Sequence, residues 1–429
     1  MSTGTPPPEA PAVPPMPTEP PRIPAPPSFP PAPPAPPVPA ASAAAGGRSS
    51  WVSRLTFRGG AVLGLAVALV VGLIGWLVAD ALGATGTSHH RSRPQAATSL
   101  APVPVATPSA SASASPSASP SPSTTQAPAL TTAVTCPAAT VTVSSASALT
   151  AALSHVQPGA VIDLADGTYG GQFSMTAVGT AAQPVFLCGG RGAVLDGGDT
   201  KKGYALHVTD SAYVRLVGFT AQDAQKGVVL DDTQDSVVQG LLVQQTGDEG
   251  IHLRERSSDD LVIGNTITHT GIKRAKYGEG VYVGSAQSNW CTYTSCQPDT
   301  SDHDIVKGNV FGYTTAENID IKEGTTGGQI LDNTLNGEGM SPEGASAWVN
   351  VKGNDYLIEG NTGRGSLKDG FQTHQILPGW GTDNTFKDNA AIVDGPGYGF
   401  HLTPVLGNTV ACDNTEQGAS RGLTNVTCS

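Results

Sequence analysis

Three charged residues in one short stretch, NIDIKEGTTGGQILDNT, are candidates for chemistry: Asp320, Lys322 and Glu323. Ile319 and Ile321 alternate with Asp320 and Lys322, and alternate side chains of a β-strand point to opposite faces. We therefore expect the isoleucines to face a core and the two charged residues to share the outer face. Carboxylate oxygens are ligands that Ca²⁺ prefers, and a lysine beside another cation has a lowered pKa, which favours use as a base.

A repeated unit surrounds this stretch. Short strands recur along the chain, and each precedes an apolar stretch that ends in asparagine; the strands read GVVL, GIHL, GVYV, NIDI, WVNV, GFQT and GFHL. The asparagines are Asn265, Asn309, Asn333, Asn361, Asn389 and Asn414, which return every 24 to 28 residues apart from one longer interval. This period is typical of solenoids, and a unit of short strands and glycine turns predicts a β-helix.

The repeated asparagines have a structural explanation. Asn tolerates the left-handed conformation, and stacked Asn side chains can hydrogen-bond along a ladder. Leucine-rich repeats have a similar period, but they need several leucines in register, and this pattern is not present. We therefore predict a structural role for these asparagines.

Outward residues of successive coils should form columns, because coils of a β-helix stack about 4.8 Å apart. The first column is predicted to contain Val229, His252, Tyr282, Asp320, Asn350, Gln372 and His401. The second, two residues further along each strand, contains Asp231, Arg254, Gly284, Lys322, Lys352, His374 and Thr403. These side chains can hydrogen-bond to sugars, stack on them or neutralise uronate carboxylates. An ordinary solvated strand face remains the alternative interpretation.

The columns give a specific site hypothesis. We expect three basic residues to be catalytic: Lys322, Lys352 and Arg254. The expected substrate-binding residues are His252, Tyr282, Trp290, Asn350, Gln372, His374 and His401. Asp320 and Glu323 are the candidate ligands of a Ca²⁺ ion.

The start of the repeat region supplies a cap and a resemblance. Leu149, Leu153 and Val156 fall on one face of a helix that begins behind serines and ends at Pro158-Gly159. The passage that follows, VIDLADGTYGGQFSMTAVGTAAQPVFLCGGRGAVLDGG, resembles the first coil of right-handed parallel β-helix polysaccharide lyases of the chondroitinase B and alginate lyase group. The predicted fold class is therefore all-β, a right-handed parallel β-helix with an N-terminal capping helix.

The resemblance implies a uronate lyase, which neutralises a sugar carboxylate and abstracts the adjacent C–H proton. The GHG signature of the polygalacturonases and the RxPxxR pattern of the pectate lyases are absent from the repeats, and the single RxK tripeptide there, at Arg274 to Lys276, has no GHG partner. Two classes therefore stay open: a polysaccharide lyase, assisted by Ca²⁺, and a non-catalytic module that binds a polysaccharide or cell-wall glycan.

One insertion lengthens a single coil. The loop SAQSNWCTYTSCQPDTSDHD lies between Ser285 and Asp304, directly after the strand that carries Tyr282. Long insertions in solenoid repeats usually map to a functional face. We expect Trp290 to stand on this loop as an aromatic platform for sugars; the alternative is that its ring packs inward.

The first third of the chain has a different composition. Residues 1–47 are rich in proline and residues 84–133 in serine, proline and alanine, which predicts a disordered tail and a disordered linker. Residues 59–82 contain an uncharged apolar run of the length of a transmembrane helix. Nearby arginines favour a cytoplasmic N-terminus, with residues 134–429 folded outside the cell. A partner for the proline-rich tail is not identifiable.

All six cysteines follow the apolar run, as expected for an oxidising compartment. Chain proximity favours pairing of Cys291 with Cys296 and of Cys412 with Cys428, among fifteen possible connectivities. The formal net charge of −12 argues against nucleic acid as a partner, because phosphates require a basic face.

Overall fold

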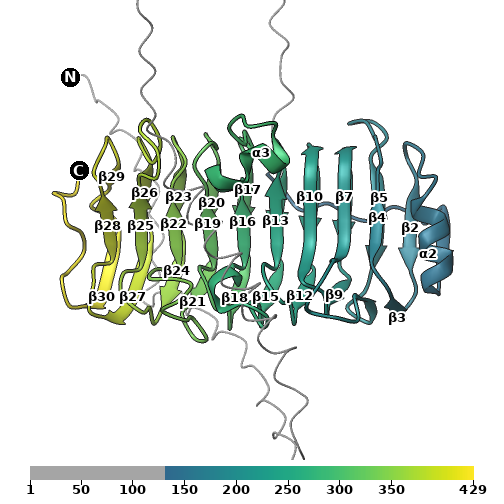
Figure 1. Cartoon of the computed structure of the whole chain (residues 1–429), viewed down its shortest axis with the longest axis horizontal. Coiled ribbons are helices and arrows are strands. Elements are labelled where there is room, and N and C mark those ends of the chain that lie inside the picture. Colours follow the sequence, from purple (N-terminus) through teal and green to yellow (C-terminus); the bar gives the residue numbers. More distant parts are fainter. Residues whose placement is uncertain (1–130) are drawn as a thin grey trace, which may run out of the picture. The chain divides into compact units, whose positions relative to one another are not determined.

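The computed structural model describes residues 131–429, which form a parallel β-solenoid (Figure 1). Three sheets of eleven, ten and nine strands, here called sheets A, B and C, run along the solenoid, and each strand pairs in parallel with its equivalent in the next coil. The predicted all-β parallel β-helix is therefore confirmed. The β-helix is right-handed, as connections between parallel strands almost always are.

The strands are short and recur in the same order in each coil. Sheet A contains β1 (Val141–Val143), β2 (Val161–Leu164), β5 (Val185–Gly189), β8 (Val214–Val217), β11 (Val237–Gln239), β14 (Leu261–Ile263), β17 (Ile305–Lys307), β20 (Gln329–Leu331), β23 (Leu357–Glu359), β26 (Thr385–Lys387) and β29 (Thr409–Val410). Sheet B contains β3 (Gly167–Gly170), β6 (Ala193–Asp196), β9 (Thr220–Gln222), β12 (Leu242–Gln244), β15 (Thr266–Thr268), β18 (Val310–Gly312), β21 (Thr334–Asn336), β24 (Thr362–Arg364), β27 (Ala390–Gly395) and β30 (Thr415–Ala419). Sheet C contains β4 (Phe173–Met175), β7 (Tyr204–Ala212), β10 (Lys226–Gln234), β13 (Ile251–Arg254), β16 (Val281–Val283), β19 (Ile319–Ile321), β22 (Val349–Val351), β25 (Phe371–His374) and β28 (Phe400–Thr403).

The interior is a continuous apolar core. Ile319 and Ile321 are fully buried in it, as the alternation in the sequence predicts. Aromatic rings of successive coils also stack inside: the centroids of Phe371 and Phe400 are 4.9 Å apart and the rings are nearly parallel. The regular inward positions therefore fix which residues of each strand point outward.

The asparagine ladder is present and is structural. The Asn265 side-chain amide donates to the Asn309 side-chain oxygen at 2.9 Å, and the same bond links Asn309 to Asn333, Asn333 to Asn361, Asn361 to Asn389 and Asn389 to Asn414. The expected left-handed conformation is displaced by one residue, because Gly264, Gly308 and Asp332, each just before a ladder asparagine, have positive φ. The asparagines thus stabilise the turn by hydrogen bonding.

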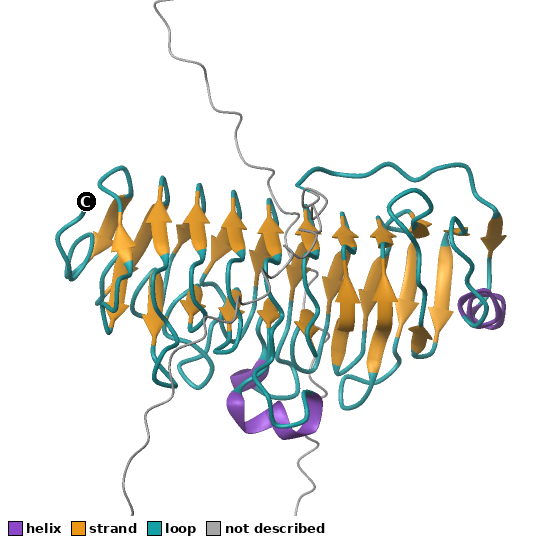
Figure 2. Cartoon of the chain, turned by 90° about the horizontal axis from the view of Figure 1, so that it is seen from above, coloured by secondary structure: helices purple, strands orange, loops and turns teal. Residues whose placement is uncertain are grey.

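A helix caps the N-terminal end, as predicted. Helix α2 (Ala146–Leu153) begins at Ser145, whose hydroxyl accepts a hydrogen bond from the Ala148 N–H at 3.2 Å. Leu149 and Leu153 are buried against the first coil, and Val156 packs beside them. The helix covers the open end of the core (Figure 2).

The remaining helical elements are short: η1 (Ala275–Tyr277), η2 (Gln287–Asn289) and α3 (Trp290–Tyr293). Figure 2 shows helical loops standing off one side of the solenoid. Disulfides link Cys291 to Cys296 and Cys412 to Cys428, as predicted, and a third links Cys136 to Cys188.

No helix among residues 131–429 is long and apolar enough to cross a membrane. The predicted proline-rich tail (1–47), transmembrane helix (59–82) and nearly all of the linker (84–133) lie outside the described residues.

Candidate active site

The outer face of sheet C carries the first predicted column. Strand pairing aligns Val229 with His252, His252 with Tyr282, Tyr282 with Asp320, Asp320 with Asn350, Asn350 with Gln372 and Gln372 with His401. The second column is paired at its ends, Asp231 with Arg254 and His374 with Thr403. The register predicted from the sequence is therefore the register of the sheet.

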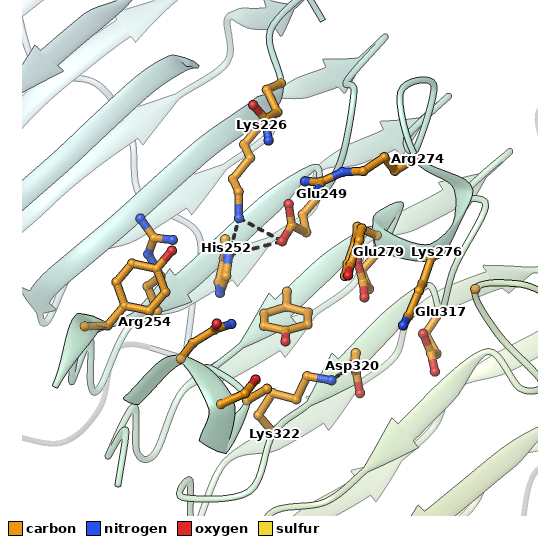
Figure 3. Close-up of a pocket in the computed structure, with 18 of the residues that line it drawn as sticks. Lys226, Glu249, His252, Arg254, Arg274, Lys276, Glu279, Glu317, Asp320 and Lys322 are labelled. Carbon is orange, nitrogen blue, oxygen red and sulfur yellow. Dashed lines mark hydrogen bonds and ion pairs between the residues drawn. The ribbon is translucent and has the colours of Figure 1, made fainter. Parts of the chain in front are cut away.

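A cavity of about 780 Å³ lies over the middle of this face. Its floor is formed by sheet C, and its walls come from the loops that contain α3 and η1 (Figure 3). The charged residues that line it are Lys226, Glu249, Arg254, Arg274, Lys276, Glu279, Glu317, Asp320, Lys322, Glu343 and Lys352. Six of these are basic and five acidic, so the lining is formally cationic in a chain whose net charge is −12.

Asp320 joins two lysines from successive coils. The Lys322 ammonium lies 2.6 Å from one Asp320 carboxylate oxygen, and the Lys352 ammonium contacts the other. Burial raises the pKa of Asp320, but Lys322 and Lys352 outweigh this effect and lower it below the ordinary value. The carboxylate therefore stays ionised and holds both lysines at the cavity floor.

The two lysines differ although they share one carboxylate. Burial alone lowers the pKa of Lys322, but Asp320 outweighs burial and raises it well above the ordinary lysine value. For Lys352 burial, with the charge of Lys322, outweighs the attraction of Asp320, so its pKa is lowered. Lys322 is thus a permanent cation, whereas Lys352 loses its proton more easily.

A third column, not predicted from the sequence, contains Glu249, Glu279 and Glu317. Each glutamate precedes the first column by three residues, in EGIH, EGVY and ENID, and that recurrence could have revealed them. Backbone hydrogen bonds connect the three coils at these positions, from Gly250 N–H to the Glu279 carbonyl and from Gly280 N–H to the Glu317 carbonyl.

The glutamates of this column crowd one another. Burial, together with Glu249 and Glu317, raises the pKa of Glu279 well above its usual range. The pKa of Glu317 is raised by burial and by Asp320. Burial and the neighbouring carboxylates thus favour the protonated form of Glu279, which can donate a hydrogen bond.

Of the predicted Ca²⁺ ligands Asp320 and Glu323, only Asp320 belongs to the group of carboxylates that converge at the cavity. Glu323 accepts a hydrogen bond from the Gln287 N–H at 2.8 Å, at the base of the insertion loop. The carboxylates that do converge with Asp320 are Glu279 and Glu317, whose ligand atoms lie within 4.8 Å of one another. Both Asp320 oxygens already contact ammonium groups, so a metal ion at these carboxylates would share Asp320 with two internal cations.

His252 is buried and neutral at the N-terminal side of the cavity. Its Nε2 lies 2.9 Å from the Gly284 carbonyl, so this nitrogen carries the proton, and its Nδ1 lies 3.3 Å from the Lys226 ammonium. Burial, with Lys226 and Arg254, lowers the pKa of His252 well below its ordinary value. Lys226 also bonds Glu249 at 2.8 Å.

Tyr282 lies between His252 and Asp320 in the first column. It is buried, its ring contacts His252 at a centroid distance of 4.4 Å, and the Lys322 ammonium lies 4.8 Å from its centroid. Burial raises the pKa of Tyr282 well above its ordinary value. Within residues 131–429, no protein group forms a hydrogen bond with its hydroxyl, which is thus a protonated donor free for a ligand.

Arg254 lies at one end of the cavity and is held rigidly. Its Nε and one terminal nitrogen bond the two Asp231 oxygens at 2.6 and 2.9 Å, and the Tyr204 hydroxyl accepts another bond at 3.2 Å. The Tyr293 ring covers the guanidinium, 4.1 Å from Cζ to centroid.

Unsatisfied polar atoms concentrate at the cavity. Residues 131–429 contain four buried side-chain atoms without a hydrogen-bond partner, and three of them belong to the lining residues Glu249, Arg254 and Glu279. Each such atom costs about 1–3 kcal/mol, a cost that native proteins tolerate where the group has a functional partner. This concentration points to a polar ligand.

Trp290 is not the exposed platform that the sequence led us to expect. The side chain is buried, with 7% of its surface exposed, and its indole N–H donates to the Ser285 carbonyl at 2.9 Å. That expectation is wrong because a short loop needs its own apolar core, which Trp290 supplies. Tyr293 and Asn289 of the same loop face the cavity instead.

Four predicted binding residues of the strand columns do not line the cavity: Asn350, Gln372, His374 and His401. Gln372 is buried and bonds Asp369, and His401 also contacts Asp369, at 3.1 Å. His374 bonds the Asn350 side chain at 2.7 Å, and burial together with Lys352 lowers its pKa to about 4. These side chains continue the polar face towards the C-terminal coils without lining the cavity.

Comparison with known proteins places the chain among β-helix proteins. Residues 178–365 match the model of the family described as periplasmic copper-binding protein (NosD). No curated protein sequence matches the chain. Among solved structures, pectate lyase Pel9A is similar over 62% of this chain and 72% of that chain, at 16% identity and a TM-score of 0.43.

A stronger similarity is to the alginate lyase from Paenibacillus sp. str. FPU-7. The two are 35% identical, the match covers 67% of this chain and 100% of that chain, and the TM-score is 0.58. The chain therefore belongs to the same β-helix family as the Paenibacillus alginate lyase.

Proposed function

We propose that the chain is a lyase for acidic polysaccharides, acting at the cavity on sheet C. The observation that carries this proposal is the pair of buried lysines on Asp320, set beside a buried tyrosine whose hydroxyl is free. The 35% identity to an alginate lyase supports alginate as the first substrate to test.

The reaction is a β-elimination at a uronate. A base removes the C5 proton, the C–H electrons form the C4=C5 double bond, the C4–O bond breaks, and the leaving oxygen takes a proton. The carboxylate must be neutralised while negative charge develops on it. Preorganised cations and donors in a dry site provide this stabilisation.

Lys322 supplies the neutralising cation, because its raised pKa keeps it charged. Glu279, neutral at the same wall, donates a hydrogen bond to the sugar carboxylate. Both groups are present before substrate binds, so no proton has to be moved to create them.

Lys352 acts as the base and Tyr282 as the acid. The lowered pKa of Lys352 allows an uncharged amine, which donates one N–H to Asp320 and keeps its lone pair for the C5 proton. The raised pKa of Tyr282 keeps its hydroxyl protonated, ready to protonate the leaving oxygen. No step requires a metal ion.

The test uses the purified full chain with alginate, polygalacturonate, chondroitin and carboxyl-reduced alginate. We expect ultraviolet absorbance from the new double bond with an acidic polymer and none with the reduced control. Lys352→Met and Tyr282→Phe should each lower kcat about 10²–10⁴-fold, the usual contribution of acid–base groups. In wild type, kcat should rise with pH as Lys352 loses its proton, through a pKa below the ordinary lysine value.

Two outcomes would overturn the proposal. New reducing ends without the double bond would identify a hydrolase. Retention of the polymer without either product would identify the chain as a glycan-binding module.

We also propose that residues 59–82 anchor the chain in the cell membrane, with the N-terminus cytoplasmic and the β-helix outside. The three disulfides support an oxidising compartment for the β-helix. Cell fractionation should place the intact chain with membranes, and protease added to intact cells should remove the β-helix. Recovery of the intact chain from the medium would contradict the anchor.

A further inference from the structure

Arg254 lies apart from the reacting groups of the cavity. It belongs to β13, whereas Asp320 and Lys322 belong to the coil of β19, and β16 lies between them. Two coil steps of about 4.8 Å separate these positions by about 10 Å along the solenoid. A sugar whose carboxylate contacts Lys322 therefore leaves Arg254 to a neighbouring sugar of the same polymer.

The guanidinium is built for recognition of an anion. Asp231 accepts two hydrogen bonds from the guanidinium, and His207 in turn contacts Asp231 at 2.7 Å. These contacts fix the orientation of the Arg254 side chain. One terminal nitrogen, Nη1, remains buried without a hydrogen-bond partner. An arginine held in this way offers a planar donor that matches a carboxylate.

Tyr293 covers this position. Its ring stacks on the guanidinium at 4.1 Å, and the residue is itself partly exposed on the α3 loop. A cation–π contact at an exposed site stabilises the folded chain by only about 0.5–1 kcal/mol. A hydrogen bond to a charged group stabilises it more. A sugar carboxylate can therefore replace the ring against Nη1.

We infer that Arg254 binds the carboxylate of a second uronate, beside the sugar that reacts, and that Tyr293 covers it until the polymer enters. This inference rests on the proposed function, because it assigns a specificity subsite to the same cavity. Its consequence is a requirement for two acidic sugars in one chain. Arg254 is then a specificity-determining residue with no direct part in proton transfer.

The experiment compares the full-length wild type with Arg254→Lys on alginate oligomers of increasing length. Arg254→Lys keeps the charge but loses the planar donor, so KM for long oligomers should rise about tenfold or more while kcat stays near wild type. Oligomers too short to reach Arg254 should show the same KM with both proteins. A loss of kcat at every length would place Arg254 at the reacting sugar and overturn the inference.

A second, milder variant tests the inference in case Arg254→Lys does not fold. Tyr204→Phe removes one contact of Arg254 and leaves its charge and the Asp231 pair intact. It should raise KM for long oligomers by a smaller factor, with an unchanged melting temperature. An unchanged KM with both variants would also overturn the inference.

Binding separates this inference from the proposed function. Affinity electrophoresis in gels containing alginate or carboxyl-reduced alginate reports retention whether or not the polymer is cleaved. Retention of wild type by alginate that weakens in Arg254→Lys supports the inference even if no double bond forms, in which case only the lyase proposal has failed. Equal retention of both proteins, or no retention of wild type, would overturn the inference.

Discussion

The Lys322 ammonium lies 2.6 Å from the carboxylate of Asp320, which precedes it by two residues in the same coil. Lys352, from the next coil, contacts the other oxygen of Asp320, so the three side chains form a buried triad. Asp320→Asn should leave two buried ammonium groups without their counter-ion. We expect a loss of about 3–5 kcal/mol in the free energy of unfolding at neutral pH, measured by denaturant titration.

The pH dependence of this loss has a definite sign. The pKa of Asp320 is lowered in the folded chain, so its contribution is fully present above the unfolded-state value of about 3.9 and is lost as pH falls through the lower folded value. The difference between wild type and Asp320→Asn should shrink below about pH 4. Asp332→Asn, at an exposed turn, is the matched control and should change little. A difference that persists in acid would contradict the ionised triad.

Glu279→Gln should stabilise the chain at neutral pH. The folded state raises the pKa of Glu279, so this residue favours folding most below its unfolded-state value of about 4.3 and loses that contribution as pH rises. The uncharged amide avoids this loss, and we expect a gain of at least about 1 kcal/mol at pH 7 that disappears near pH 4. Thermal unfolding at several pH values checks this. Glu343→Gln, an exposed carboxylate of the same lining, should leave the melting temperature unchanged at every pH.

Trp290→Ala should destabilise the insertion loop, because the buried indole is the core of that loop. Removal of a buried tryptophan costs about 3–5 kcal/mol, here expressed as local opening of residues 285–304. Hydrogen exchange of the loop amides measures this opening directly. Tyr293→Leu, at the partly exposed last residue of α3, should leave loop exchange near wild type. Equal exchange in wild type and Trp290→Ala would show that the indole does not support the loop.

Removal of divalent metal should leave stability and activity unchanged. Glu279, Glu317 and Asp320 form a cluster of three carboxylates. The ammonium groups of Lys322 and Lys352 already contact the two oxygens of Asp320 and supply positive charge to this cluster. Melting temperatures with a chelator and with added Ca²⁺ should therefore agree. A melting temperature that rises with Ca²⁺ concentration would show that the ion binds the folded chain and displaces a lysine.

The sequence by itself determined the solenoid and the columns on its outer face. Alternation within each strand and a period of 24 to 28 residues specify which side chains point outward, and the asparagine ladder fixes the register from coil to coil. The sequence alone therefore aligns Tyr282, Asp320 and Asn350. The glutamates of EGIH, EGVY and ENID obey the same rule, and their recurrence was visible in the sequence although we did not predict their role.

Only the tertiary structure decided how those columns become a site. The insertion loop and the η1 loop lie outside the repeat, so no periodicity indicates that Tyr293, Asn289 and Lys276 wall the cavity or that Trp290 turns inward. The protonation of the two cavity lysines also depends on the tertiary structure. The opposite pKa directions of Lys322 and Lys352 depend on the burial of each ammonium and its distances to Asp320, which are properties of packing in three dimensions.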